Sequence, residues 1–252
     1  MSNGLRVGEV NEPRAVSIAS TLEVVEPREG YVSAAEQWDR EGPGWGGIEF
    51  ASPSADWDAG NASKLQERLI RCLDIFGALG LFIITLPVML VTSCLIKILS
   101  PGPVLYKQER VGKGGKRFIL YKFRSMVVDA EKHVGPVWAT PDDDRVTLIG
   151  KFLRASRIDE LPQLINVLKG DMSLVGPRPE RPFFVEQHEA LRGVRLAVKP
   201  GLTGFAQIRA LYDLKPSNKL RYDALYIQKR SVLLNLYILV MTIPVVLRKT
   251  GW

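Results

Sequence analysis

Hydrophobic and polar positions change their pattern at two points along the chain. Residues 1–63 show no sustained apolar period and are rich in Glu, Gly, Pro and Ser. Residues 64–100 contain a long apolar run, whereas residues 101–252 combine short alternating and helical patterns. A polar segment such as 1–63 buries too little apolar surface to offset its chain entropy. We therefore expect a disordered tail at 1–63, a membrane helix at 64–100 and a folded region at 101–252.

The apolar run contains no charged residue between Ile75 and Ile96. A straight helix of that length measures roughly 33 Å, which matches the hydrocarbon core of a bilayer, so an ordinary transmembrane helix is one interpretation. Pro87 near its middle removes a backbone hydrogen bond and bends a helix. Basic residues flank both ends of the run, and such flanks stay on the cytoplasmic side. A reentrant helix that bends at Pro87 and returns accounts for both observations.

The ends of this helix carry their own signals. Ser63 is a suitable N-cap, and the Ser-Pro-Gly-Pro sequence at 100–103 is typical of a helix stop. Arg71 and Asp74 stand three residues apart at the start of the run, so we expect Arg71 to neutralise Asp74. Arg71, Asp74 and Pro87 are therefore the predicted structural residues of the membrane helix.

The rest of the chain predicts a mixed α+β fold. Apolar and polar residues alternate over 104–126 on both sides of a Gly-rich turn, which indicates a β-hairpin. Residues 128–133 favour a short polar helix, 161–168 show helical spacing that ends at Gly170, and 198–208 are typical of a loop. The final apolar segment, 231–252, is short for a span and contains Asn235 and Pro244, which favours an in-plane or core helix. The prediction is a small hairpin or sheet with several short and amphipathic helices.

Composition narrows the range of partners. The chain has 252 residues and a net charge of +7, spread along its length without a Lys/Arg block. Diphosphates or anionic lipid headgroups fit this pattern at least as well as DNA, and we expect no nucleic-acid partner. The two cysteines form no C-x-x-C pair, and the sequence contains no Cys/His cluster. We therefore expect neither a disulfide framework nor a zinc site.

The strongest chemical candidates are Asp159 and Glu160, adjacent carboxylates at the expected start of a helix. One interpretation is structural: Asp159 caps the helix, and Ser156 with Asp159 resembles a capping box. The other is catalytic. A carboxylate at a helix N-terminus, with Arg154 and Arg157 just upstream, is favoured in its ionised form and can attack phosphorus.

Basic residues form two further candidate sites. Pro177 and Pro179 stiffen the backbone around Arg178, which suits bidentate phosphate binding, and Arg181 adds a second guanidinium; a buried ion pair is the alternative for Arg178. Lys122 and Arg124 share one face of the second hairpin strand, where they bind a diphosphate or else form a solvated face.

Three segments together, residues 100–126, 154–182 and 198–208, resemble the bacterial sugar transferase family behind a Pro-bent apolar helix. These enzymes are monotopic phosphoglycosyl transferases that act on polyprenyl phosphate, and the resemblance covers roughly residues 65–250. It implies transfer of a phosphosugar from a UDP-sugar to undecaprenyl phosphate, with release of UMP, as the initiating step of exopolysaccharide, O-antigen, capsule or glycoconjugate synthesis. The alternatives kept open are a nucleotide-sugar diphosphatase and a non-catalytic membrane scaffold.

The resemblance also implies roles for individual residues. Asp159 matches the nucleophile that forms a covalent phosphosugar intermediate, and Glu160 matches its partner, as an orienting group or a ligand of Mg²⁺ together with Asp159. Lys122, Arg124 and Arg178 match phosphate-binding positions, and Arg154, Arg157 and Arg181 are the further candidates for substrate binding. Expected partners are the UDP-sugar, undecaprenyl phosphate and the membrane, with a second copy of the chain and downstream glycosyltransferases as further candidates. Residues 101–252 then form a catalytic domain with C-terminal interfacial helices on the cytoplasmic face of the bacterial inner membrane.

Overall fold

The protein is described from a computed structural model, which describes residues 63–132, 135, 137, 143–188, 191–209 and 216–247. The chain divides into two compact units, Met1–Gly42 and Pro43–Trp252, and all of the described residues lie in the second. The disordered tail expected for residues 1–63 therefore lies outside the described residues, apart from Ser63 at its boundary.

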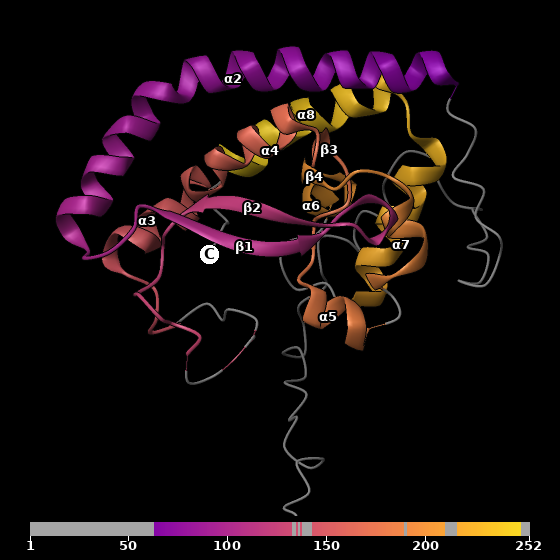
Figure 1. Ribbon diagram of the computed structural model, residues 1–252. Coiled ribbons are helices and arrows are strands. Elements are labelled where there is room, and N and C mark those ends of the chain that lie inside the picture. Colours follow the sequence, from indigo (N-terminus) through magenta and orange to yellow (C-terminus); the bar gives the residue numbers. More distant parts are fainter. Residues whose placement is uncertain are drawn as a thin grey trace, which may run out of the picture. The chain divides into compact units, whose positions relative to one another are not determined.

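The long apolar run forms one helix, α2 (Lys64–Leu99), which bends along its length (Figure 1). The Ser63 hydroxyl accepts a hydrogen bond from the backbone N–H of Gln66, and the helix ends at Ser100, so both predicted ends are confirmed. Pro87 lies inside the helix. By length and composition, α2 is sufficiently long and apolar to cross a membrane.

The predicted hairpin is confirmed as strands β1 (Leu105–Val111) and β2 (Arg117–Phe123), which pair antiparallel. A single turn of 3-10 helix, η2 (Lys113–Gly115), connects them. Gly114 and Gly115 have φ angles of 66° and 76°. Glycine adopts this left-handed conformation without steric cost, which explains the turn at this point of the sequence.

A second pair of strands was not expected. Strands β3 (Ser173–Val175) and β4 (Gly201–Thr203) pair in parallel, and the helix α6 (Phe205–Arg209) follows directly, so the loop predicted at 198–208 is wrong for most of its length. The strands approach closely beside Gly176. A Cβ atom on Gly201 would lie 2.0 Å from the backbone nitrogen of Gly176. Only glycine permits this approach, which determines where the chain leaves β3.

Helices supply most of the remaining structure. The described elements are α3 (Leu148–Ala155), η3 (Ile158–Gln163), α4 (Leu164–Lys169), α5 (Pro182–Gln187), η5 (Gly193–Ala197), α7 (Pro216–Lys229) and α8 (Val232–Leu247). Gly170 ends α4 with a φ of 90°, as the sequence predicts. The polar helix expected at 128–133 is wrong, because residues 128–132 form turns and Asp129 has a φ of 58°. A left-handed residue interrupts a right-handed helix.

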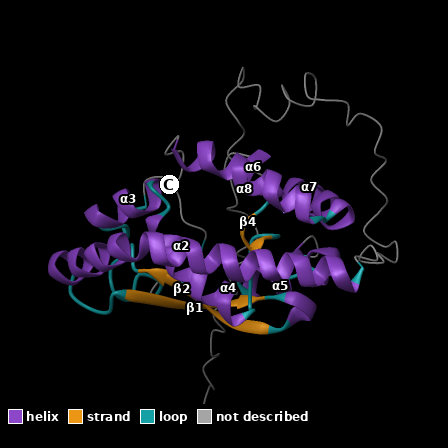
Figure 2. Cartoon of the chain, turned by 90° about the horizontal axis from the view of Figure 1, so that it is seen from above, coloured by secondary structure: helices purple, strands orange, loops and turns teal. Residues whose placement is uncertain are grey.

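The main core lies where α2, β2, α4, β3 and α8 meet. Its buried side chains include Ala78 from α2, Leu120 from β2, Leu164 from α4, Leu174 from β3 and Ile238 from α8. Figures 1 and 2 show that α2 passes over α4 and α8, while the hairpin lies on the other side of α4. The helix that carries the apolar run therefore packs directly on the part of the fold that contains the acidic pair.

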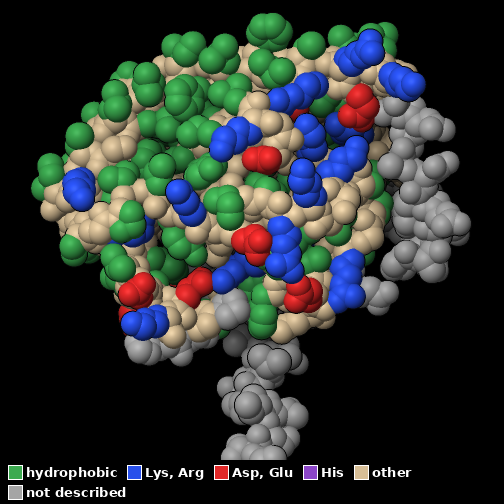
Figure 3. Space-filling view, viewed as in Figure 1, with side chains coloured by type: hydrophobic (Ala, Val, Ile, Leu, Met, Phe, Trp, Pro, Cys, Tyr) green, Lys and Arg blue, Asp and Glu red, His purple; other side chains and the backbone are tan. Residues whose placement is uncertain are grey.

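The outer faces of α2 and α8 remain apolar. Phe76, Ile84 and Ile98 on α2 and Leu233 and Val240 on α8 are all more than half exposed. Figure 3 shows hydrophobic side chains gathered along α2 and around its bend. A surface of this kind is typical of contact with a membrane rather than with water.

Polar contacts fix the start of α2 on the fold. The Asp74 carboxylate accepts hydrogen bonds from the Ser173 hydroxyl and the Leu174 backbone N–H, both at 2.8 Å. Arg71 donates to the carbonyl oxygens of Val167 and Leu168 at the end of α4. The expected neutralisation of Asp74 by Arg71 is therefore limited to an interaction through space, because the hydrogen bonds of both side chains go to other partners.

Candidate active site

Asp159 and Glu160 lie in the first turn of η3, between α3 and α4. Both residues are buried: the exposed fraction is 4% for Asp159 and 8% for Glu160. The residue before η3, Arg157, has a φ of 59°, a left-handed conformation that is uncommon for a residue with a side chain. This conformation turns the chain from α3 into η3, and it brings the two carboxylates inward. Backbone strain of this kind is often found at functional sites.

The capping interpretation of the acidic pair is wrong. The Ser156 hydroxyl donates to the carbonyl oxygens of Phe152 and Leu153, and Ser156 is the C-cap of α3. The N-cap position of η3 is Arg157, and no side chain makes a capping hydrogen bond there. Local backbone capping therefore does not explain why Asp159 and Glu160 stand at this point.

Asp159 combines burial with an unsatisfied oxygen. Its Oδ2 lies 4.0 Å from the Nζ of Lys122 on β2, while its Oδ1 is buried and has no hydrogen-bond partner within the part of the chain that the structure describes. Burial raises the pKa of Asp159, and the nearby Lys122 opposes this shift. Arg154 lowers the pKa of Asp159, as expected, but the loss of solvation is larger, so the net shift is upward.

Glu160 has a different environment. Its carboxylate accepts two hydrogen bonds from Arg178, at 2.6 Å and 3.4 Å. Burial acts to raise the pKa of Glu160, but the charges of Arg178 and Lys122 and the hydrogen bonds from Arg178 together outweigh it and lower that pKa to about 2. The buried ion pair that was the alternative for Arg178 thus exists, and its partner is the second carboxylate of the pair. Glu160 is consequently an ionised, oriented group, whereas Asp159 retains an available oxygen.

The structure divides the predicted cations into two sets. Lys122, Arg154, Arg157 and Arg178 all interact with the acidic pair electrostatically. Arg154 also donates to the Ser125 hydroxyl at 3.0 Å, which holds its side chain in place. These four side chains form the cationic surroundings of the site.

Arg124 and Arg181 bind elsewhere. Arg124 is buried and donates to the carbonyl oxygens of Ser100 and Pro101 at the end of α2. Arg181 forms a two-pronged ion pair with Glu131 at 2.8 Å and 2.7 Å. In both cases the guanidinium group has a structural partner, so the expected grouping of Lys122 with Arg124 on one diphosphate is not what the structure brings together.

Asn166 on α4 is a residue that the sequence reasoning missed. It is fully buried, and its side-chain amide donates to the Ile119 carbonyl and accepts from the Tyr121 N–H. It therefore binds the edge of β2 next to Lys122 and ties the hairpin to the helix that follows the acidic pair. The sequence did contain a signal for this role, because Asn166 is a polar residue between Ile165 and Val167 in an apolar helical pattern. A polar side chain that is buried in such a position needs hydrogen-bond partners.

The carboxylates fit a hard divalent cation only in part. No group of three or more His, Cys, Asp or Glu side chains suitable for a metal occurs among the described residues. Mg²⁺ is commonly bound by one or two carboxylates, with substrate phosphates and water completing its coordination. The unsatisfied Oδ1 of Asp159, beside Glu160, matches that requirement.

Comparison with known proteins identifies the family of the chain. Residues 65–249 match the family described as bacterial sugar transferase. A Bacillus subtilis (strain 168) protein, provisionally named undecaprenyl-phosphate N-acetylgalactosaminyl 1-phosphate transferase, is 61% identical over 47% of this chain and 66% of its own length. A UDP-N-acetylgalactosamine-undecaprenyl-phosphate N-acetylgalactosaminephosphotransferase from Aeromonas hydrophila is 44% identical over 75% of this chain and 46% of its own.

A third relative names a different sugar. The UDP-glucose:undecaprenyl-phosphate glucose-1-phosphate transferase of Xanthomonas campestris pv. campestris is 39% identical over 76% of this chain and 40% of its own length. The chain thus spans about half the length of these relatives.

Proposed function

The chain belongs to the bacterial sugar transferase family, and from this premise we propose that it transfers a sugar 1-phosphate from a UDP-sugar to undecaprenyl phosphate. The names of its relatives support the two substrates. The observation that carries the proposal is Asp159, a buried carboxylate with an available oxygen beside Lys122 and the Glu160–Arg178 pair. The product is an undecaprenyl-diphosphate sugar, which initiates assembly of a polysaccharide or glycoconjugate.

Asp159 acts as the nucleophile in two displacements. In the first, its carboxylate oxygen forms a bond to the sugar-bearing phosphorus of the UDP-sugar, and the bond from that phosphorus to UMP breaks. In the second, a phosphate oxygen of undecaprenyl phosphate attacks the same phosphorus, and the Asp159 carboxylate leaves. A covalent relay divides one difficult reaction between two anions into two steps.

The cations around Asp159 hold the phosphates. Lys122 lies beside Asp159, and Arg178 binds Glu160 while part of its side chain stays exposed. Both are placed to bind phosphate oxygens and to stabilise the charge that develops at the attacked phosphorus. Glu160 orients Arg178, since the two form charge-assisted hydrogen bonds. Arg154 and Arg157 add positive charge from α3 and from the turn that follows it.

Mg²⁺ is the proposed cofactor, with Asp159 and Glu160 as its protein ligands. When bound, it would neutralise negative charge on the diphosphate of the donor. The available Oδ1 of Asp159 supports this assignment.

We propose that α2 is reentrant and that the protein is monotopic on the cytoplasmic face of the inner membrane. Near its start, Arg71 and Asp74 bind α4 and β3. At its end, the carbonyls of Ser100 and Pro101 bind Arg124, which follows β2. Both ends therefore contact the body that carries the acidic pair, which supports a return to the same side of the membrane.

A single assay tests the proposed reaction. Membranes that contain the protein are supplied with undecaprenyl phosphate, Mg²⁺ and a panel of UDP-sugars, including UDP-glucose and UDP-N-acetylgalactosamine, and UMP is measured. We expect sustained UMP release only when the lipid phosphate is present. Sustained release without it would instead support a nucleotide-sugar diphosphatase.

The Asp159→Asn variant tests the nucleophile. We expect it to abolish turnover and covalent labelling by the sugar phosphate, because an amide oxygen is a poor nucleophile at phosphorus. Glu160→Gln should lower turnover severely but leave the nucleophile in place. Full activity of Asp159→Asn would rule out the nucleophile assignment. An absence of turnover in the natural protein itself would instead favour the scaffold alternative.

A further inference from the structure

The loop that carries Arg178 has an unusual set of backbone contacts. Residues 177–180 present four consecutive carbonyl oxygens, and each accepts a hydrogen bond from β4, η5 or β1. The donors, in order, are the Gly201 N–H at 2.9 Å, Arg195 Nη2 at 3.1 Å, Arg110 Nη1 at 3.1 Å and the Val111 N–H at 3.0 Å. Two of these donors are arginine side chains, so the loop is held from both sides by charged groups.

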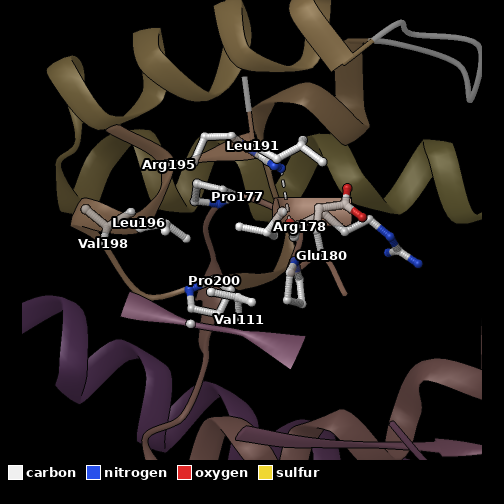
Figure 4. Close-up of a pocket in the computed structure, with 12 residues that line it drawn as sticks. Val111, Pro177, Arg178, Glu180, Leu191, Arg195, Leu196, Val198 and Pro200 are labelled. Carbon is white, nitrogen blue, oxygen red and sulfur yellow. Dashed lines mark hydrogen bonds between the residues drawn. The ribbon is translucent and has the colours of Figure 1, made fainter. Parts of the chain in front are cut away.

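The donor to Arg178 itself is part of a buried ion pair. Arg195 lies in η5, and its Nε donates to the Asp223 carboxylate on α7 at 2.7 Å. Their side chains are only 4% and 2% exposed. Figure 4 shows Arg195 beside the small pocket that Val111, Pro177 and Leu191 help to line, with Arg178 at its edge. Asp223 supplies the charge that allows Arg195 to remain buried at this position.

We infer that Arg195, held by Asp223, is a positioning residue that fixes the backbone of Arg178 and thereby directs its guanidinium group toward Glu160. The flanking prolines support this inference. Pro177 has a restricted φ, and Pro179 restricts the backbone of the residue before it, which is Arg178. The Arg195 hydrogen bond removes further freedom at the same residue. The catalytic meaning of this inference rests on the proposed function.

A purely structural ion pair is the competing explanation, and the two differ in what they predict. A structural pair would affect the folded fraction of the protein and nothing else. A positioning pair also affects where the Arg178 side chain lies. It therefore affects how far the ion pair with Glu160 protects the Arg178 guanidinium group from chemical reagents.

The test compares Arg195→Lys and Asp223→Asn with the unmodified enzyme. A lysine ammonium keeps the charge but cannot reproduce the fork that contacts Asp223 and the Arg178 carbonyl together. Asp223→Asn keeps the shape of the partner and removes its charge. Arg117→Lys, in an exposed ion pair, controls for the exchange of arginine for lysine. Ile238→Val, in the core, controls for a modest loss of stability.

The first measurement needs no substrate. Phenylglyoxal, an arginine-selective reagent, modifies each protein, and peptide mass spectrometry gives the labelling rate of Arg178 relative to Arg117. In Arg117→Lys, exposed Arg192 replaces Arg117 as the reference. We expect faster labelling of Arg178 in Arg195→Lys and Asp223→Asn, and an unchanged rate in both controls. An unchanged rate in the two test variants would overturn the inference. If one of them fails to fold, the other decides.

The second measurement is turnover. We expect kcat of Arg195→Lys to fall on the order of a hundredfold, since small misplacements of a catalytic group have effects of that size. Because Arg178 is the displaced phosphate-binding group, KM for the UDP-sugar should rise as well, whereas Ile238→Val should change neither constant per folded molecule. Constants per folded molecule that match those of Ile238→Val would indicate a structural role.

The two measurements separate failure of this inference from failure of the proposed function. If the unmodified enzyme releases no UMP with undecaprenyl phosphate, the proposed function fails, while labelling of Arg178 still decides the positioning role. If the unmodified enzyme is active and the test variants match the controls, only the positioning role fails.

Discussion

Asp159 and Glu160 are neighbours in the chain but occupy different electrostatic surroundings. Burial acts to raise the pKa of Glu160, but Arg178 and Lys122 together lower it to about 2, whereas burial raises the pKa of Asp159. When two interacting carboxyl groups are shifted in opposite directions, the one with the raised pKa takes up a proton first as the pH falls. The proposed nucleophile is therefore the residue whose protonation limits activity on the acid side.

Replacement of Lys122 tests this assignment. Lys122 is the cation that most lowers the pKa of Asp159, so Lys122→Gln should raise that pKa further. Because a carboxyl group attacks phosphorus only when it is ionised, the proposed role of Asp159 means that the acid limb of kcat/KM for the UDP-sugar should move to higher pH. Arg154→Gln should move it in the same direction by less, since Arg154 is the weaker influence. The measurement is UMP release over a pH series.

Lys116→Gln, at an exposed position next to the hairpin turn, is the matched control and should leave the limb in place. A limb that moves to lower pH in Lys122→Gln, or that stays where it is, would contradict the assignment of Asp159 as the titrating nucleophile.

Asn166 connects two elements, the hairpin and α4, through a pair of side-chain hydrogen bonds. Asn166→Ala leaves the Ile119 carbonyl and the Tyr121 N–H without these partners. We expect the free energy of unfolding to fall by roughly 1–3 kcal/mol, the usual cost of unsatisfied buried groups. Thermal unfolding in detergent micelles measures the change. Lys151→Ala on the exposed face of α3 is the control, and an equal loss there would show that the amide contacts are unimportant.

The β3–β4 pair controls where the Arg178 loop begins. Gly201→Ala would place a Cβ atom 2.0 Å from the Gly176 nitrogen, so the strands must separate. We expect this overlap to lower the free energy of unfolding by about 1–3 kcal/mol. UMP release per folded molecule should also fall, because the strands position Pro177. Gly80→Ala on α2 meets nothing within 4 Å and should be nearly neutral in both assays. Equal behaviour of the two variants would refute the argument.

The predictability of each element follows from the range of the interactions that form it. The hairpin and the ends of α2 and α4 were predictable, because alternation, Ser63 and Gly170 are local signals. The parallel β3–β4 pair was not, because each strand has three residues and its partner is distant in sequence. For the same reason the sequence located the acidic pair but could not show that Arg124 and Arg181 bind other partners.

At the scale of the whole molecule, the length and bend of α2 bear on how the protein would contact a membrane. If α2 were a straight helix of 36 residues, it would measure roughly 54 Å, far more than the hydrocarbon core. It bends instead (Figure 1), and Asp74 in its first third and Ser100 directly after it both bind the body that carries the acidic pair. In the proposed reentrant arrangement, its exposed apolar side chains enter one leaflet, while the polar contacts of Asp74 and Ser100 stay with the body that carries the acidic pair.

This arrangement predicts that the segments before and after α2 lie on the same side of the membrane. Reporter tags fused at residue 60 and at the C-terminus should both report the cytoplasm, because the contacts of Asp74 with β3 and of Arg124 with Ser100 cannot form on opposite sides of a bilayer. A fusion to a protein with a known periplasmic terminus provides the positive control for the other outcome. A periplasmic signal from the tag at residue 60, with a cytoplasmic C-terminus, would establish a full span. In that case the contacts at the two ends of α2 could not both exist in the membrane.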